Sequence, residues 1–293
     1  MKQNEASITA YTVLQGLMYL AKKTPHSYLV DPETARLGEC ILKYSDEGRK
    51  RLNDLESFGF KWKVKLREAL LLPGITIHYA LRKRCIEEYV LAEIADGIEQ
   101  VVCLGAGFDS LLFRLAKEHP SISFIEVDHP NTQQFKQQAL QEAHQNNLNY
   151  LSIDFTEQDL HDRLIGSKIF QPTQKTLYIC EGVLMYLSQD DIQHMFKTLS
   201  YLSGKQSRIV FTAIEPHQSD QSNVPKILHY YLKLIGEPLK WTCRANKVDA
   251  FLENNKARLI SLNQTDHLKQ RFLKADDRST LHYGEYVALA EFD

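Results

Sequence analysis

The sequence predicts an α/β fold, a doubly wound and mostly parallel sheet with helices on both faces. Short apolar or β-branched segments alternate with segments of helical periodicity from about residue 98 onward. The first three segments, EQVVCLGAG, FDSLLFRLAKEH and SISFIEVDHP, have the order strand, helix, strand of a parallel βαβ unit. Two glycines, Gly105 and Gly107, end the first strand, at the sheet edge where such folds bind their ligands.

The other elements follow in order along the chain. The first 97 residues predict a helical region, because apolar residues recur at helical spacing in 8–22 and the charged run 45–71 is rich in helix-forming residues. After the βαβ unit, the alternation continues with helices in TQQFKQQALQEAHQ and QDDIQHMFKTLSYLS and strands in NYLSID, KTLYICEG and SRIVFTAIEP. Two closing strands, ARLISLNQT and HYGEYVALAEF, bring the predicted sheet to seven strands.

One stretch breaks the alternation and is interpreted as a lid insertion over the carboxyl ends of the strands. We therefore predict a single domain that spans residues 1–293. Its parts are an N-terminal helical region (1–97), a cofactor-binding core (98–215), the lid insertion (216–250) and the closing strands (251–293).

Composition and charge exclude several classes of function. The 35 basic and 37 acidic residues nearly cancel, so we expect no nucleic-acid partner. No run of eighteen apolar residues and no convincing signal peptide occur, so we expect a cytoplasmic protein without a membrane partner. The five cysteines are scattered, with no CxxC pair and no histidine cluster at zinc spacing, so we expect reduced thiols and no metal.

The glycine pair is a weak signal alone, because glycines also serve ordinary tight turns. Glu126 strengthens it, since we expect Glu126 to close the second strand and accept hydrogen bonds from both hydroxyls of a ribose. Asp128 lies two positions on, on the same face, and either shares this role or caps the helix that follows. Ser110 stands where a third glycine would bind a pyrophosphate, which favours a nucleoside ligand over a dinucleotide.

Two further strand ends carry candidate binding residues. Asp154 and Phe155 follow the third strand, where a carboxylate can accept from an adenine amino group and an aromatic ring can cover the base. Asp154 is alternatively a helix cap. Glu181 ends the fourth strand at the centre of the expected cleft, with Gly182 allowing close backbone approach. Tyr186 follows at a distance that allows its side chain to reach the opening of the same cleft. Alternatively, it packs as an ordinary core aromatic.

Taken together, these segments resemble the leucine carboxyl methyltransferase family of S-adenosylmethionine-dependent methyltransferases, including its bacterial small-molecule branch. The resemblance also covers SITAYTVL, YLVDPETARL and ALRKRCIEEYV near the start of the chain. It implies the Rossmann-like methyltransferase fold and S-adenosylmethionine as the cofactor. It also implies site residues: Glu181 and Tyr186 as catalytic, and Arg82, Gly105, Ala106, Gly107, Glu126, Asp154, Phe155, Glu181 and Gly182 as cofactor-binding.

Within that set the resemblance assigns parts of the cofactor to residues. Arg82, or Arg84 as the fallback, would pair with the cofactor's carboxylate, and Glu181 would lie near its amino group and sulfonium. The chain departs from the family pattern Gly-Leu-Asp-Thr-Arg at one position, where Leu111 replaces the arginine.

The expected activity is O-methyl transfer to a carboxylate or hydroxyl of a small molecule or a protein C-terminus. An ionised carboxylate needs no general base, whereas a hydroxyl does, and His217 and Tyr230 are the candidates. Two alternatives stay open: a nicotinamide-dependent oxidoreductase on the same type of sheet, and a non-catalytic relative that binds only the cofactor or a partner protein. Aromatic residues around the insertion either line an acceptor pocket or simply pack: Tyr230, Tyr231, Trp241 and Phe251.

Overall fold

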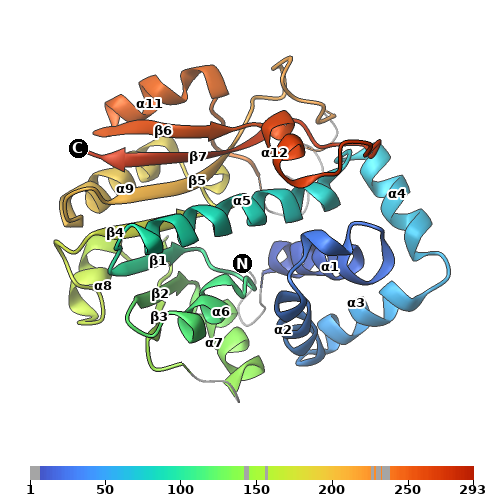
Figure 1. The fold of residues 1–293 in the computed structure, drawn as a ribbon, viewed down its shortest axis with the longest axis horizontal. Coiled ribbons are helices and arrows are strands. Elements are labelled where there is room, and N and C mark those ends of the chain that lie inside the picture. The colour runs from blue at the N-terminus through green and yellow to red at the C-terminus, as the bar shows by residue number, and fades with distance from the viewer. Residues whose placement is uncertain (1–6, 142–144, 156–157, 226–227, 229–231, 233–237) are drawn as a thin grey trace.

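The computed structural model describes the whole chain except residues 1–6, 142–144, 156–157, 226–227, 229–231 and 233–237. A seven-stranded sheet forms its centre (Figure 1), with strand order β3-β2-β1-β4-β5-β7-β6. The strands are β1 (Gln100–Leu104), β2 (Ser123–Asp128), β3 (Leu148–Ser152), β4 (Thr176–Cys180), β5 (Arg208–Ile214), β6 (Ala257–Asn263) and β7 (Glu285–Phe292). All seven coincide with predicted strand segments.

The strand directions confirm the doubly wound, mostly parallel sheet. Strands β1 to β5 pair in parallel, while β7 is antiparallel to both β5 and β6. The chain winds from β1 outward to β3 and then returns to β4 on the other side of β1. The loops after β1 and β4 are therefore neighbours at the carboxyl edge, which is the topological switch point where open α/β sheets bind ligands.

Helices cover both faces of the sheet. Apolar side chains from α5 (Ile75–Ala95), α6 (Leu111–Glu118) and α12 (Thr265–Phe272) share a hydrophobic cluster with one face, and α7 (Pro130–Ala139) lies beside α6. The other face packs against α8 (Leu160–Gly166), α9 (Gln189–Leu202) and α11 (Val248–Asn254). Local sequence signals set the helix starts. A capping box, in which Ser188 and Asp191 exchange hydrogen bonds, begins α9.

The N-terminal residues are helical, as predicted, and pack on the face that α5 covers. They form α1 (Ile8–Lys23), the short η1 (Ser27–Leu29), α2 (Pro32–Lys43), α3 (Asp46–Glu56) and α4 (Phe60–Leu70). A turn at 57–59 divides the charged run into α3 and α4. The side chain of Asp31 accepts from the backbone N–H groups of Glu33 and Thr34, and this cap places α2 beside α1.

The predicted lid insertion is only partly described, and Tyr230 and Tyr231 lie outside the described residues. Its last part packs against the core: the backbone N–H of Lys240 donates to Met185 O at 2.8 Å, and that of Cys243 to Ile214 O at 2.9 Å. Trp241 and Phe251 contact each other, with ring centroids 5.1 Å apart, within the hydrophobic cluster under α9. The packing interpretation of these two aromatics is therefore the one the structure supports.

Among the helices that the structure describes, none combines the length and the apolar character needed to cross a bilayer.

Candidate active site

The bend after β1 brings two backbone segments close together. Gly105 (φ 73°) and Gly107 (φ 52°) both occupy the left-handed region, which glycine adopts without a steric penalty. A Cβ atom at position 105 would collide with the side chain of Val183, which follows β4. The loops after β1 and β4 can therefore meet only because residue 105 has no side chain.

The carboxylate that the bend contacts belongs to Asp128, the last residue of β2. The backbone N–H of Gly107 donates to this carboxylate in a short hydrogen bond, and the N–H of His129 donates to it at 2.6 Å. The amide of Gly105 donates in turn to Val127 O at 2.7 Å. Burial raises the pKa of Asp128, and the two backbone N–H donors oppose that effect. An acidic group is thus fixed beside the glycine bend.

Glu126 does not close β2, so the sequence prediction of its position is wrong. The strand continues for two more residues, and Glu126 lies inside it with its side chain only 2% exposed. Its carboxylate is 2.6 Å from the ammonium of Lys136 on α7, which is 1% exposed. Residues two apart on a strand share a face but lie roughly 6.6 Å apart along it. Helix α7 therefore covers Glu126, while Asp128 reaches the strand end.

Asp154 and Phe155 lie just beyond β3, beside the end of β2, as the sequence predicted. The backbone N–H of Ile153 donates to Asp128 O at 2.9 Å, which holds the two strand ends together. The carboxylate of Asp154 is 3.4 Å from Nε2 of His129, and its side chain is partly exposed. Phe155 is partly buried against the hydrophobic cluster on the α9 side of the sheet. A carboxylate and an aromatic ring thus stand at the same edge as Asp128.

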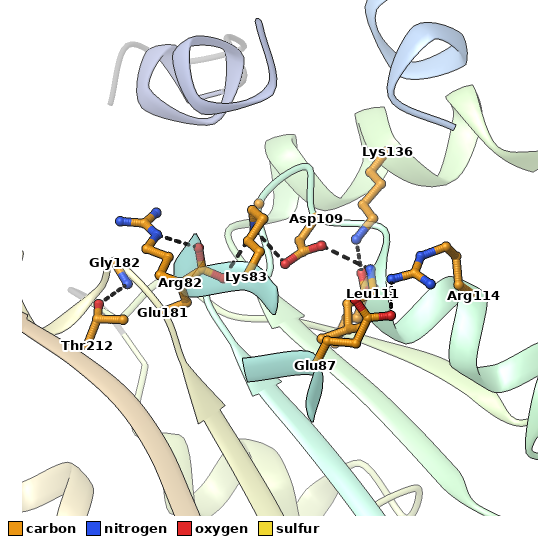
Figure 2. Close-up of polar contacts among 12 residues, drawn as sticks. Arg82, Lys83, Glu87, Asp109, Leu111, Arg114, Lys136, Glu181, Gly182 and Thr212 are labelled. Carbon is orange, nitrogen blue, oxygen red and sulfur yellow. Dashed lines mark hydrogen bonds and ion pairs between the residues drawn. The ribbon is translucent and has the colours of Figure 1, made fainter. Parts of the chain in front are cut away.

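A chain of alternating charges crosses the switch point (Figure 2). Nε of Arg82 donates to Glu181 at 2.8 Å, and Nζ of Lys83 lies 3.1 Å from Glu181 and 2.7 Å from Asp109. The other side of Arg82 donates to both carboxylate oxygens of Glu285, at 3.0 and 2.9 Å. Helix α5 supplies both cations. The carboxylates come from the loop after β1 (Asp109), the residue after β4 (Glu181) and the first residue of β7 (Glu285).

The charge chain keeps Asp109, Lys83 and Arg82 ionised despite burial. Burial raises the pKa of Asp109, but the Lys83 ammonium, together with Lys136 and the N–H of Leu111, lowers this pKa to about 2. Burial lowers the pKa of Lys83, and the carboxylates of Asp109 and Glu181 more than restore it. In the same way Glu285 and Glu181 raise the pKa of Arg82 above its ordinary value. Arg82 and Lys83 therefore stay cationic over the whole working pH range.

Gly182 and Tyr186 complete the β4 side. Gly182 has a left-handed backbone (φ 68°), and its N–H donates to Thr212 Oγ1 at 2.9 Å. A Cβ atom there would lie 3.6 Å from Nη2 of Arg82, so the absent side chain leaves room beside the guanidinium. Tyr186 ends the short helix η3 (Leu184–Tyr186) and is half-buried.

The family comparison decides the identity. The family model for leucine carboxyl methyltransferase matches residues 12–200, which is more than half of the chain. The chain belongs to the leucine carboxyl methyltransferase family. It is thus a methyltransferase, and its cofactor is S-adenosylmethionine, as the sequence predicted; the oxidoreductase alternative is set aside.

Individual relatives agree with the family. The Bacillus subtilis protein named "Putative S-adenosyl-L-methionine-dependent methyltransferase YktD" is 27% identical over 208 residues, covering 67% of this chain and 68% of YktD. A Parafrankia protein of the same designation, Franean1_4929, is 33% identical over 146 residues, covering 49% of this chain and 46% of that protein. The match thus spans about half the length of the second relative.

The fold agrees with a solved methyltransferase. The structure of "a putative sarcosine dimethylglycine methyltransferase" from Galdieria sulphuraria superposes with a TM-score of 0.50 at 10% identity, covering 74% of this chain and 87% of that one. At that identity the likeness concerns the fold alone, and it supports the Rossmann-like methyltransferase architecture.

The residues present fit the cofactor of the leucine carboxyl methyltransferase family. The methionine part of S-adenosylmethionine carries one carboxylate and one ammonium, and the charge chain offers Arg82 and Lys83 for the first and Glu181 and Asp109 for the second. The open backbone at Gly107 meets only Ala10 Cβ, at 3.7 Å, if a Cβ is added. The carboxyl edge of the sheet therefore has groups suited to both the charged methionine part and the nucleoside part of the cofactor.

Sequence reasoning missed several members of this site. Lys83 and Asp109 lie inside motifs that were singled out, but neither was assigned a role. Glu285 gave no signal, because it stands 203 positions from Arg82 and only the antiparallel insertion of β7 brings the two together.

Leu111, the departure from the family pattern, is buried at the start of α6, and its N–H donates to Asp109 at 3.0 Å. The Lys83 ammonium is the cation that pairs with Asp109 in this chain (Figure 2).

Proposed function

We propose that the chain transfers a methyl group from S-adenosylmethionine to an oxygen atom, that of a carboxylate or hydroxyl on a small molecule or a protein C-terminus. The observation that carries the proposal is the alternation Arg82, Glu181, Lys83, Asp109 beside the glycine bend, because it matches a zwitterionic methionine tail in sign and order. The description of the matching family, which is named for a carboxyl acceptor, supports oxygen as the acceptor atom.

Each strand end has a defined part in this proposal. Arg82 would bind the cofactor's carboxylate and Glu181 its ammonium, which holds the methionine end over Gly105, Ala106 and Gly107. Asp128, rather than Glu126, would accept from the ribose hydroxyls, because it is the carboxylate at the open end of β2. Asp154 and Phe155 would contact the adenine.

The chain contributes mainly alignment. The bound cofactor supplies a methyl group on a sulfonium, which is a good leaving group without further activation. Holding donor and acceptor in line can lower a barrier by several kcal/mol, about 7 in favourable cases. Tyr186, which ends the short helix η3 four residues after Gly182, would orient the acceptor oxygen. Because Arg82 and Glu181 are anchored by Glu285 and Lys83, they lose little freedom when the cofactor binds.

The need for a general base depends on the acceptor. A carboxylate is ionised at neutral pH and attacks directly, whereas a hydroxyl must lose a proton. His217 follows β5 in the described part of the insertion and remains the candidate base for a hydroxyl acceptor. Tyr230, the other candidate, lies outside the described residues.

A radiolabelled methyl-transfer screen tests the proposal. Carboxylic acids, phenols, alcohols and peptides with a free C-terminus would be offered together with labelled cofactor. Methyl esters release volatile methanol in mild base and methyl ethers do not, so the product class reveals the acceptor. Transfer to nitrogen or carbon acceptors alone would refute the oxygen acceptor. Cofactor binding without turnover on any class would favour the non-catalytic alternative. A cytoplasmic location is kept as part of the proposal.

A further inference from the structure

Helix α4 turns an apolar stripe outward. Phe58, in the turn before the helix, and Trp62, Leu66 and Leu70 within it recur at intervals of four residues, which places the helical ones on one side. These side chains are between 57% and 103% exposed. Large apolar groups gathered on one surface mark an interaction site more often than single exposed ones do.

The opposite side of α4 explains why the stripe is not core. Val64 is buried, and Phe60 packs edge-on against Tyr19 of α1 with ring centroids 5.5 Å apart. The inner side therefore anchors the helix to the N-terminal region. In Figure 1 the helix lies at the periphery of the molecule, away from the sheet. Its outer side, which carries the stripe, lies at the edge of the molecule.

Basic residues border the stripe on both sides. At 100° per residue, Lys61 and Lys65 precede it around the helix, and Lys63 and Arg67 follow it. Within the described part of the chain, no ion pair engages any of these four. The one acidic side chain of α4, Glu68, is turned inward, where it accepts from the N–H of Thr76 at 3.1 Å. The outer side is thus apolar in the middle and positive at both margins.

We propose that α4 docks this methyltransferase on an anionic lipid bilayer surface, lying in the plane of the headgroups. A short helix with tryptophan and leucine on one side and lysines along its borders has the composition of interfacial helices. Trp62 suits that depth, since indole prefers the boundary between headgroups and acyl chains. The helix has 11 residues, far fewer than a bilayer crossing requires, so it would lie on the surface.

The charge on α4 favours an anionic bilayer over a second copy of the chain as its partner. If two copies of the chain paired through α4, the basic residues that border each stripe would come together. Like-charge repulsion disfavours that arrangement. A flat anionic surface can attract the basic residues on both sides of the stripe at the same time. The proposal replaces the expectation of no membrane partner, which was drawn from the lack of a long apolar run, because a surface helix needs no such run.

Vesicle co-sedimentation of the 293-residue chain tests the proposal. Vesicles of phosphatidylcholine alone would be compared with vesicles that also contain phosphatidylglycerol, at low and high salt. We expect binding to the anionic vesicles that weakens as salt rises. Tryptophan emission gives a second readout, since the chain has 2 tryptophans and Trp241 is buried. A blue shift on binding would then come from Trp62.

Matched variants locate the contact. The double variant Trp62→Ser with Leu66→Ser, and the double variant Lys61→Gln with Lys65→Gln, should each reduce vesicle affinity about tenfold or more. Tyr201→Ser, an equally exposed aromatic on α9, should change it less than twofold. Binding of S-adenosylhomocysteine should be unchanged in all of them, which separates this proposal from the proposed function. No binding to anionic vesicles, equal loss in the Tyr201 variant, or a concentration-dependent dimer abolished by the Trp62 and Leu66 changes would overturn it.

Discussion

The ammonium of Lys136 lies 2.6 Å from the carboxylate of Glu126, and both side chains are buried between β2 and α7. This pair engages the Glu126 carboxylate under α7, two residues before the end of β2. Asp128, two residues later, is the carboxylate that the glycine bend contacts. The separation of these two acidic residues leads to distinct expectations for stability and for cofactor binding.

Glu126→Gln should destabilise the fold without touching the cofactor site. It leaves the charge of Lys136 buried and uncompensated, which typically costs about 3–5 kcal/mol. Glu126→Leu combined with Lys136→Met removes both charges and should cost much less. Urea unfolding measures both. Equal losses in the single and double variants would contradict a tight, mutually dependent ion pair.

Asp128→Asn should weaken cofactor binding while leaving the fold stable. The amide oxygen can still accept from the N–H of Gly107, but the charge that would bind the ribose hydroxyls is lost. Hydrogen bonds to charged groups contribute about 1.5–3 kcal/mol, so affinity for S-adenosylhomocysteine should fall about ten- to a hundredfold by calorimetry. Glu126→Gln is the matched control, and an affinity loss confined to that variant would restore the original ribose assignment.

Arg82→Met should lower affinity for S-adenosylhomocysteine at least about tenfold, because the guanidinium that would bind the cofactor's carboxylate is removed. Arg84→Met, one position beyond Lys83 on α5, should have little effect. Arg82 also neutralises Glu181 and Glu285, so its loss lowers the stability of the fold as well. Arg82→Lys is therefore the second variant. Arg82→Lys keeps the positive charge but loses the planar guanidinium donors. Its affinity for S-adenosylhomocysteine should lie between those of wild type and Arg82→Met. Equal effects of the Arg82 and Arg84 changes would refute the assignment.

Stability should fall as the pH drops below 6.5, partly because of His282. Burial, followed by the neighbouring His78, lowers the pKa of His282 to about 3. The unfolded chain protonates this imidazole near its ordinary pKa of 6.5, while the folded chain does not. The folded state therefore keeps its full advantage above pH 6.5 and loses it as the pH falls towards 3, at up to about 1.4 kcal/mol per pH unit.

The comparison of His282→Asn with His267→Asn isolates that contribution. His267 is exposed on α12 and serves as the control. Chemical unfolding at pH values from 7 to about 4 should give a shallower slope for His282→Asn than for wild type, and an unchanged slope for His267→Asn. A steeper or identical slope for the His282 variant would contradict a neutral, buried imidazole.

Local patterns predicted most of the fold. Strand alternation, the glycines with left-handed backbones and the helix-capping residues depend on neighbours in the chain, so the seven strands and the glycine bend could be anticipated. The placement of Asp154, Phe155 and Glu181 at the carboxyl edge followed from strand ends in the same way.

Tertiary packing decided the rest. Glu126 and Asp128 share one face of β2, so alternation alone does not reveal that α7 covers one and leaves the other at the strand end. Glu285 reaches Arg82 only through the antiparallel pairing of β7 with β5. Lys83 and Asp109 meet only because α5 packs beside the loop after β1. No local sequence pattern predicts how a helix is positioned against a distant loop.

A crystal structure of the chain with S-adenosylhomocysteine tests the central claim most directly. The account predicts the sugar hydroxyls within hydrogen-bond distance of the Asp128 carboxylate, the methionine tail between Arg82 and Glu181, and Glu126 still bound to Lys136. A ligand placed elsewhere on the sheet, or a sugar held by Glu126 with its lysine displaced, would contradict it.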